Sequence, residues 1–113
     1  MRTLQNLSDI ERGLDAELRR RIDTELTAIG FRMTVFGSRA RGDAERDSDM
    51  DVLIEVDVDH ISFADKQRLR RIATDVSIVS GIIVSLLVVD QGILAERGDF
   101  SVFENVREEG IAV

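Results

Sequence analysis

The chain has 113 residues, which suits a single domain, and it contains no cysteine, proline, tryptophan or tyrosine. The lack of cysteine excludes disulfides, thiolate metal sites and cysteine nucleophiles. A net charge of -7 argues against direct, sequence-independent binding of nucleic acid. No apolar run approaches the roughly 20 residues that span a bilayer, and the N-terminus lacks the apolar stretch of a signal peptide. We therefore expect a soluble cytoplasmic protein with no membrane partner.

The first half of the chain predicts one long helix followed by two strands. A capping-box pattern places the helix start at Ser8, with Glu11 three residues later, and Gly30 is typical of a helix end. Apolar residues recur every four positions between them and predict one buried stripe. The stripe consists of Ile10, Leu14, Leu18, Ile22 and Leu26, with Ile29 just beyond. Residues 31–36 and 50–56 have strand patterns, and the polar segment 37–48 predicts a loop with a short helix.

The second half predicts another long helix, one strand and two short helices. Ser62 is the expected cap of the helix and Gly81 its end. Its apolar stripe consists of Leu69, Ile72, Ala73, Val76 and Val79. Residues 82–89 are apolar and rich in β-branched side chains, which predicts a largely buried strand. Residues 91–97 and 100–109 have helical patterns. The order predicts an α/β (α+β) fold, with helices packed against a small mixed sheet in one domain over residues 1–113.

Acidic residues are concentrated between positions 43 and 59, where eight acids stand against a single base, Arg46. A solvated loop and strand edge is one interpretation of this run, and a cation site is the other. Side chains alternate across a strand, so Asp49 and Asp51 project to the same side about 7 Å apart. Magnesium prefers one or two carboxylates together with phosphate oxygens. The spacing therefore favours a metal site, although a lone Asp-x-Asp is more often structural.

A glycine-serine turn precedes the acidic pair by ten residues. Gly37 permits close approach of the backbone, and Ser38 opens a short helix whose free amides, with the hydroxyl, can bind an anion. One end of the segment thus suits a triphosphate and the other suits a metal. The combined pattern is far more specific than either part alone. It consists of a strand, Gly-Ser, ten residues, and Asp-x-Asp at the start of another strand. The combination predicts a phosphoryl- or nucleotidyl-transfer site.

This pattern resembles the minimal nucleotidyltransferases of the DNA polymerase β superfamily, whose signature is Gly-Ser, ten residues and Asp-x-Asp. The resemblance is strongest over residues 36–54 and extends to the C-terminal run 103–111. It implies a polymerase-β-like fold with two Mg²⁺ ions and ATP as substrate. The residue roles that it implies are Asp49 and Asp51 as the catalytic metal ligands, with Gly37 and Ser38 holding the triphosphate. Arg39 and Arg41 lie within reach of phosphate by sequence position, and a structural ion pair is the alternative for each.

The sequence departs from this family at a third acidic position. Active members usually carry a third carboxylate on a later strand, where it binds metal and accepts the proton of the attacking hydroxyl. The matching strand, residues 82–89, contains no acid, and Ser85 occupies the expected position. Asp90 is the nearest acid, but its parity places it on the other face. Three alternatives stay open. The chain transfers slowly with two carboxylates, a partner supplies the missing group, or the chain binds nucleotide without turnover.

The remaining polar candidates receive no catalytic role. His60, the only histidine, follows the acidic strand in a predicted loop. A basic helix face is expected to meet solvent, with an acidic partner or the nucleotide phosphates as alternatives. This face consists of Lys66, Arg68, Arg70 and Arg71.

These features predict Mg²⁺-dependent transfer of a nucleoside monophosphate, in the first instance AMP from ATP, to an acceptor hydroxyl; the nucleobase is not readable from the sequence. The chain offers no second domain to enclose a small acceptor, so the expected acceptor is a separate protein. Many short members of the family resemble the antitoxin of pairs whose toxin is a HEPN-type ribonuclease, which implies a HEPN-type toxin as partner, in a homo- or hetero-oligomer. The alternative is an inactive module that neutralises its partner by binding alone.

Overall fold

The computed structural model describes residues 6–113, and residues 1–5, part of the segment in which no signal peptide is predicted, lie outside that range. Over the described residues, no helix is both long and apolar enough to cross a membrane. The elements in chain order are α1 (Asp9–Glu25), β1 (Phe31–Phe36), α2 (Gly37–Arg41), β2 (Met50–Val56), α3 (Phe63–Ser80), β3 (Val84–Val89), α4 (Gln91–Arg97), α5 (Ser101–Glu109) and β4 (Ile111–Ala112).

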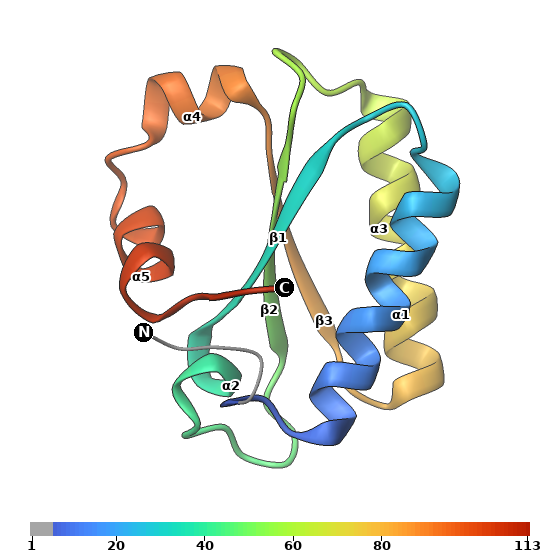
Figure 1. The fold of residues 1–113 in the computed structure, drawn as a ribbon, viewed down its shortest axis with the longest axis vertical. Coiled ribbons are helices and arrows are strands. Elements are labelled where there is room, and N and C mark those ends of the chain that lie inside the picture. Colours follow the sequence, from blue (N-terminus) through green and yellow to red (C-terminus); the bar gives the residue numbers. More distant parts are fainter. Residues whose placement is uncertain (1–5) are drawn as a thin grey trace.

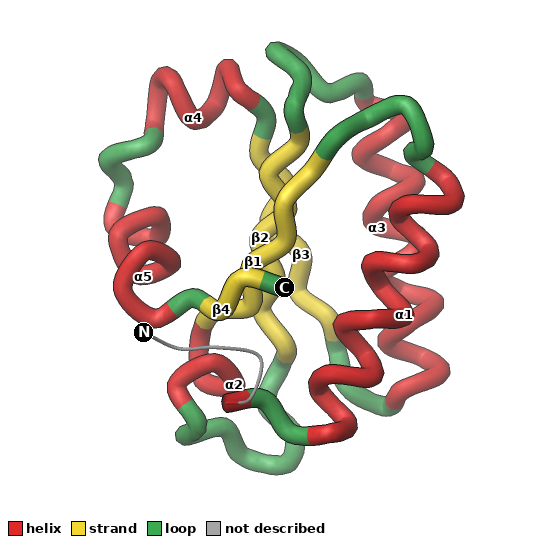
Figure 2. Tube along the Cα trace, in the orientation of Figure 1, coloured by secondary structure: helices red, strands yellow, loops and turns green. Residues whose placement is uncertain are grey.

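The four strands form one mixed sheet in the order β3-β2-β1-β4, as the predicted fold class requires. β1 pairs antiparallel with both β2 and β4, whereas β2 and β3 are parallel and joined by α3. Figures 1 and 2 show α1 and α3 on one side of the sheet and α4 and α5 on the other. The central strand β2 therefore has both faces covered, and its N-terminal end carries the acidic pair.

Alternation along β2 divides the core into two clusters. Val52, Ile54 and Val56 are buried in the large cluster beneath α1 and α3. Leu53 points to the other face and belongs to a smaller cluster with residues from β3 and α5. This is the division of faces that the period of two in the sequence indicates. It places Asp51 on the face that α5 covers.

The helix caps follow the sequence signals, with one correction at the end of α1. The Ser8 amide donates to Glu11 Oε1 at 2.8 Å, and the Glu11 amide donates to Ser8 Oγ at 3.1 Å, which completes the predicted capping box. Gly81 ends α3 with φ of 77°. However, α1 ends at Glu25 rather than near Gly30. Leu26 caps the helix through its amide, while its side chain stays in the core.

Two predicted stripe residues are not buried. Ile10 is 69% exposed and Val79 is 77% exposed. Both line an open groove between α1 and α3, where Gly13 has no side chain to cover them. The helical period therefore identifies the buried face, but not how far the neighbouring elements extend along it.

The predicted burial of residues 82–89 is wrong, because β3 is an edge strand. Within it only Val84 and Val89 are buried. Its apolar composition reflects packing on the two faces of the sheet and carries no information about whether both edges are paired. The two-residue strand β4 was not predicted, since so short a segment has no period of its own.

Asp15 gives the fold a pH-dependent stability. Its side chain is buried on α1, and among residues 6–113 its Oδ1 has no hydrogen-bond partner. Burial raises the pKa of Asp15 to about 6, against the opposing charge of Arg19. The folded state therefore holds a proton between about pH 4 and 6 that the unfolded chain releases, so this group's contribution to stability is full below that window and is lost as the pH rises through it.

We expect Asp15→Asn to raise the free energy of unfolding by about 2–3 kcal/mol at pH 7.5 and to have little effect near pH 4. Urea unfolding at both pH values measures the difference, and Asp23→Asn, at an exposed position of the same helix, is the matched control. An equal effect of Asp15→Asn at both pH values would contradict the assignment.

Candidate active site

The turn from β1 into α2 packs directly on the Asp51 carboxylate. Gly37 begins α2 with φ of 75°, a conformation that favours glycine. A Cβ at Gly37 would overlap Asp51 Oδ2 and lie 3.2 Å from the Asp51 carboxyl carbon. Ser38 follows in α2 and is partly exposed. The fold thus brings together the two halves of the motif, which lie more than ten residues apart in the chain.

The two aspartates of the motif are close enough to affect each other electrostatically. Asp49 is exposed just before β2, and Asp51 is the partly exposed second residue of β2. Burial raises the pKa of Asp51, and the neighbouring charge of Asp49 raises it further. Over residues 6–113, no three carboxylates or imidazoles come together as a metal-binding cluster. The site therefore offers two closely placed carboxylates that a cation would stabilise.

Ser85 lies beside Asp51 in the parallel pairing of β2 and β3. Aligned residues on neighbouring strands share a face, so the exposed Ser85 hydroxyl is on the same side of the sheet as the Asp51 carboxylate.

Asp90, at the far end of β3, has a structural role. Its carboxylate accepts hydrogen bonds from the amides of Ile61 and Ile93, both at 2.9 Å, and the Ile93 bond contributes most to lowering the Asp90 pKa.

Arg39 points into the protein as part of an ion pair. Its side chain is buried, and Nη1 lies 3.0 Å from Glu11 Oε2. The guanidinium also donates to the carbonyl oxygens of Ser48 and Arg46. Burial raises the pKa of Glu11, but hydrogen bonds from Ser8 and Arg39 outweigh it and lower the pKa overall. Of the two roles that the sequence leaves for Arg39, this placement favours the structural ion pair.

Arg41 faces the candidate site and connects it to α5. Its Nε lies 3.2 Å from Asp43 Oδ2, and its Nη1 lies 3.1 Å from Glu109 Oε1. The charges of Arg41 and Glu109 both act on Asp51, with opposite effects on its pKa. Sequence reasoning missed Glu109, because it lies 68 positions from Arg41 and no local motif marks it.

Comparison with known proteins agrees with this geometry. Residues 16–110, which contain the whole Gly-Ser and Asp-x-Asp motif, match the family described as a nucleotidyltransferase domain. The chain belongs to the nucleotidyltransferase domain family. A protein of Methanocaldococcus jannaschii with the name "Putative protein adenylyltransferase" is 32% identical over 79 residues, which cover 70% of this chain and 73% of that protein. Nucleotidyl transfer is thus the chemistry that the matched family and the name of this relative indicate.

The other polar candidates lie away from the motif of this nucleotidyltransferase domain. His60 packs on the start of α4, where a Cβ at Gly92 would lie 2.8 Å from the imidazole Cε1. That contact is at the C-terminal end of the parallel strands, opposite to Asp51. The basic face of α3 is on the other side of the sheet, where Arg68 pairs with Asp65 at 3.1 Å. Neither feature is placed to act at Asp51.

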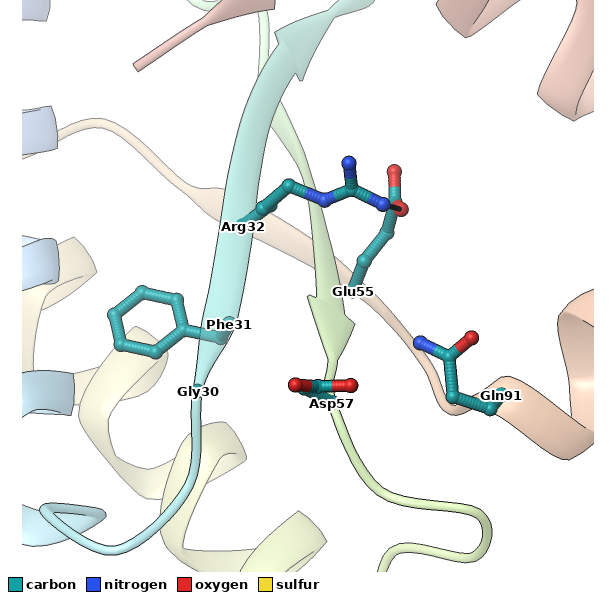
Figure 3. Close-up of a pocket in the computed structure, with 6 residues that line it drawn as sticks. All are labelled: Gly30, Phe31, Arg32, Glu55, Asp57 and Gln91. Atoms are coloured by element: carbon teal, nitrogen blue, oxygen red, sulfur yellow. Dashed lines mark hydrogen bonds and ion pairs between the residues drawn. The ribbon is translucent and has the colours of Figure 1, made fainter.

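Two hollows of the nucleotidyltransferase domain also lie apart from the acidic pair. One hollow, of 310 Å³, lies at the far end of β2. Figure 3 shows Arg32 turning toward Glu55 there and Gln91 approaching from α4. The Arg32–Glu55 pair measures 2.9 Å. The other, of 510 Å³, adjoins the Glu11–Arg39 ion pair. Neither of these two hollows is lined by an aspartate of the motif, and the acidic pair lies instead beside the exposed Ser85, with Asp49 exposed and Asp51 partly exposed.

Proposed function

We propose that this nucleotidyltransferase transfers AMP from ATP to a hydroxyl of a separately encoded protein, and that this protein is a HEPN-type toxin. The observation that carries the proposal is the packing of the Gly37 backbone against the Asp51 carboxylate. The name of the archaeal relative supports a protein as acceptor. The net charge of -7 favours a basic partner, such as an RNA-cleaving enzyme, through faster, salt-dependent association.

Asp49 and Asp51 fit the Mg²⁺ ions that the family resemblance implies. They are two neighbouring carboxylates at an open surface, and Mg²⁺ is commonly bound by one or two carboxylates together with phosphate oxygens. When bound, the ions would neutralise charge on the triphosphate and polarise the reacting oxygens. The missing side chain of Gly37 lets the Asp51 carboxylate lie against the backbone of the turn, and Ser38 adds a hydroxyl donor for the triphosphate beside it.

In the proposed reaction the acceptor oxygen attacks the α-phosphorus of ATP, the bond from the α-phosphorus to the oxygen that bridges it to the β-phosphorus breaks, and pyrophosphate leaves with that oxygen. The proton of the acceptor hydroxyl needs a base. Ser85, aligned with Asp51, has no charge and is a poor base at neutral pH. The proton therefore passes to water or to a group of the acceptor protein, and transfer by this chain is slow.

A second candidate function is neutralisation of the partner by binding alone. The presence of Ser85 at the position where the family resemblance implies a carboxylate favours it, because the fold and the nucleotide site would persist without turnover.

Co-expression with the product of the adjacent gene separates the two functions. We expect mass spectrometry to show that product with one or more added AMP units, and we expect the added mass to vanish when Asp49→Asn replaces the unmutated chain. A stable complex without added mass would contradict AMP transfer and would support neutralisation by binding alone. If neither a complex nor a modification is detected, the proposal that the partner is a protein encoded beside this chain is contradicted.

A further inference from the structure

The outer edge of β3 is unpaired. Over residues 6–113, β3 pairs with β2 and with no other strand. At the start of this pairing the Met50 amide donates to the Ile83 carbonyl oxygen at 2.8 Å. Backbone groups alternate in direction along a strand, so the amides and carbonyls of Leu86 and Val88 point away from β2. β3 thus presents a row of backbone donors and acceptors at the edge of the sheet.

One contact of α3 shows the direction of this edge independently. The Val84 amide, which has the same parity as Leu86, donates to Ser77 Oγ of α3 at 2.9 Å. Ser77 therefore satisfies the first outward amide, and the free part of the edge begins at Leu86.

This edge lacks the devices that usually prevent strand addition. Natural edge strands are blunted by charged residues, proline or a covering segment, and β3 has the sequence Val-Ser-Leu-Leu-Val-Val. The opposite edge of the sheet, formed by β1 and β4, is protected differently. There β4 pairs with Thr34 and Val35 of β1, and the uncovered part of β1 carries the charged Arg32. The open edge of β3 is typical of a strand that is completed by another chain.

Access to Asp51 indicates which chain would pair with the open edge of β3. On the β1 side, Phe36 is paired with Asp51 and Gly37 touches its carboxylate. The proposed function assigns that side to the triphosphate. On the β3 side Asp51 is bordered by Ser85, which is exposed. The exposed Ser85 therefore gives an acceptor hydroxyl a route to Asp51 from the open edge of β3.

We propose that the acceptor protein adds an extended segment along the outer edge of β3, and that this added strand presents its hydroxyl beside Ser85. The inference rests on the proposed transfer to a protein. A residue of the added strand aligned with Ser85 faces the same side as Asp51, with its Cα about 10 Å from that of Asp51, or two strand spacings. A serine, threonine or tyrosine there leaves space for the α-phosphate between its oxygen and Asp51.

The other face of the added strand meets α3. Arg70 lies two helical turns before Ser77, so both share the helix side that borders the β3 edge. Arg70 is exposed, and among the described residues its side chain has no ion-pair partner. The acceptor segment is accordingly expected to combine β-branched residues and a hydroxyl with an acidic residue on the face opposite to the hydroxyl.

Amide hydrogen exchange, read by NMR, tests the docking without any change to β3. The probe is the product of the adjacent gene, mixed with Asp51→Asn of this chain so that docking is seen without transfer. We expect exchange at Leu86 and Val88 to slow at least tenfold in the complex, while Ala112 at the other edge of the sheet is unaffected. A complex that leaves Leu86 and Val88 unprotected, or that protects β4 instead, overturns the proposal.

A substitution at the edge gives a second test. Leu86→Pro removes an outward amide and leaves the hydrogen bonds to β2, and Leu86→Ala is the control that retains the amide. We expect the proline variant alone to weaken the complex at least tenfold, with Mg·ATP affinity unchanged. If the proline variant does not fold, the exchange measurement decides.

The outcomes distinguish docking from transfer. Added AMP without protection of β3 overturns the docking and leaves the proposed function. Protection of β3 without AMP addition in the unmutated chain supports the docking and overturns transfer. Failure of both overturns both. Concentration-dependent protection of Leu86 and Val88 in this chain alone would show that a second copy occupies the edge and would also overturn the proposal.

Discussion

Asp51→Asn is expected to lower nucleotidyl transfer at least about 100-fold and to remove the Mg²⁺-dependent part of ATP binding, and Asp49→Asn is expected to do the same. Each change removes one of two carboxylates at the proposed metal site. Stabilisation of phosphoryl charge by bound metal amounts to several kcal/mol, and each 1.36 kcal/mol corresponds to a factor of ten in rate. Calorimetry with ATP in the presence and absence of Mg²⁺ measures the loss of binding directly.

The fold should survive both substitutions. Burial and the charge of Asp49 raise the pKa of Asp51, so the ionised carboxylate is unfavourable in the metal-free protein. Urea unfolding without Mg²⁺ should therefore give a free energy no lower than that of the unmutated chain. Asp57→Asn is the matched control, because it removes an exposed acid about 20 Å away, just beyond the other end of β2. Unchanged Mg·ATP affinity in both motif variants would rule out the metal site.

The parts of the fold that could be predicted are those set by local patterns. The bounds predicted for β1 and β2 agree with the structure because their side chains alternate or lie between clear turn residues. Ser8 and Ser62 mark helix starts because a side-chain oxygen accepts a hydrogen bond from a nearby amide. The motif could be predicted for a related reason. The chain order already indicates that Gly37 directly follows one strand and that Asp51 lies near the start of another.

The remaining features depend on contacts between distant residues. The edge position of β3 follows from the strand order, which its apolar composition does not specify. The burial of Arg39 depends on Glu11, 28 positions earlier. Glu109 reaches Arg41 only because α5 packs over the sheet at this point. In each case the sequence supplies the charged or apolar residue, and the tertiary fold decides its partner.

Ser85→Asp is expected to raise the rate of transfer by about 10²–10⁴-fold, which is the usual contribution of a positioned general base. The observed alignment of Ser85 with Asp51 places the new carboxylate on the correct face, and the exposure of Ser85 leaves room for it without repacking the core. Transfer would then no longer rely on water or on the partner to accept the proton.

The same substitution should cost stability when no metal is present. Three carboxylates would then crowd one face of the sheet, and like charges on neighbouring strands lower the free energy of unfolding by about 0.2–1 kcal/mol per pair. Added Mg²⁺ should restore the loss by binding between them. Ser85→Asn controls for size and polarity, since it provides neither charge nor base. Single-turnover assays with urea unfolding in the presence and absence of Mg²⁺ measure both effects. A Ser85→Asp variant that is neither faster nor less stable would show that Ser85 does not stand at the position of the missing carboxylate, and that the base for this reaction comes from elsewhere.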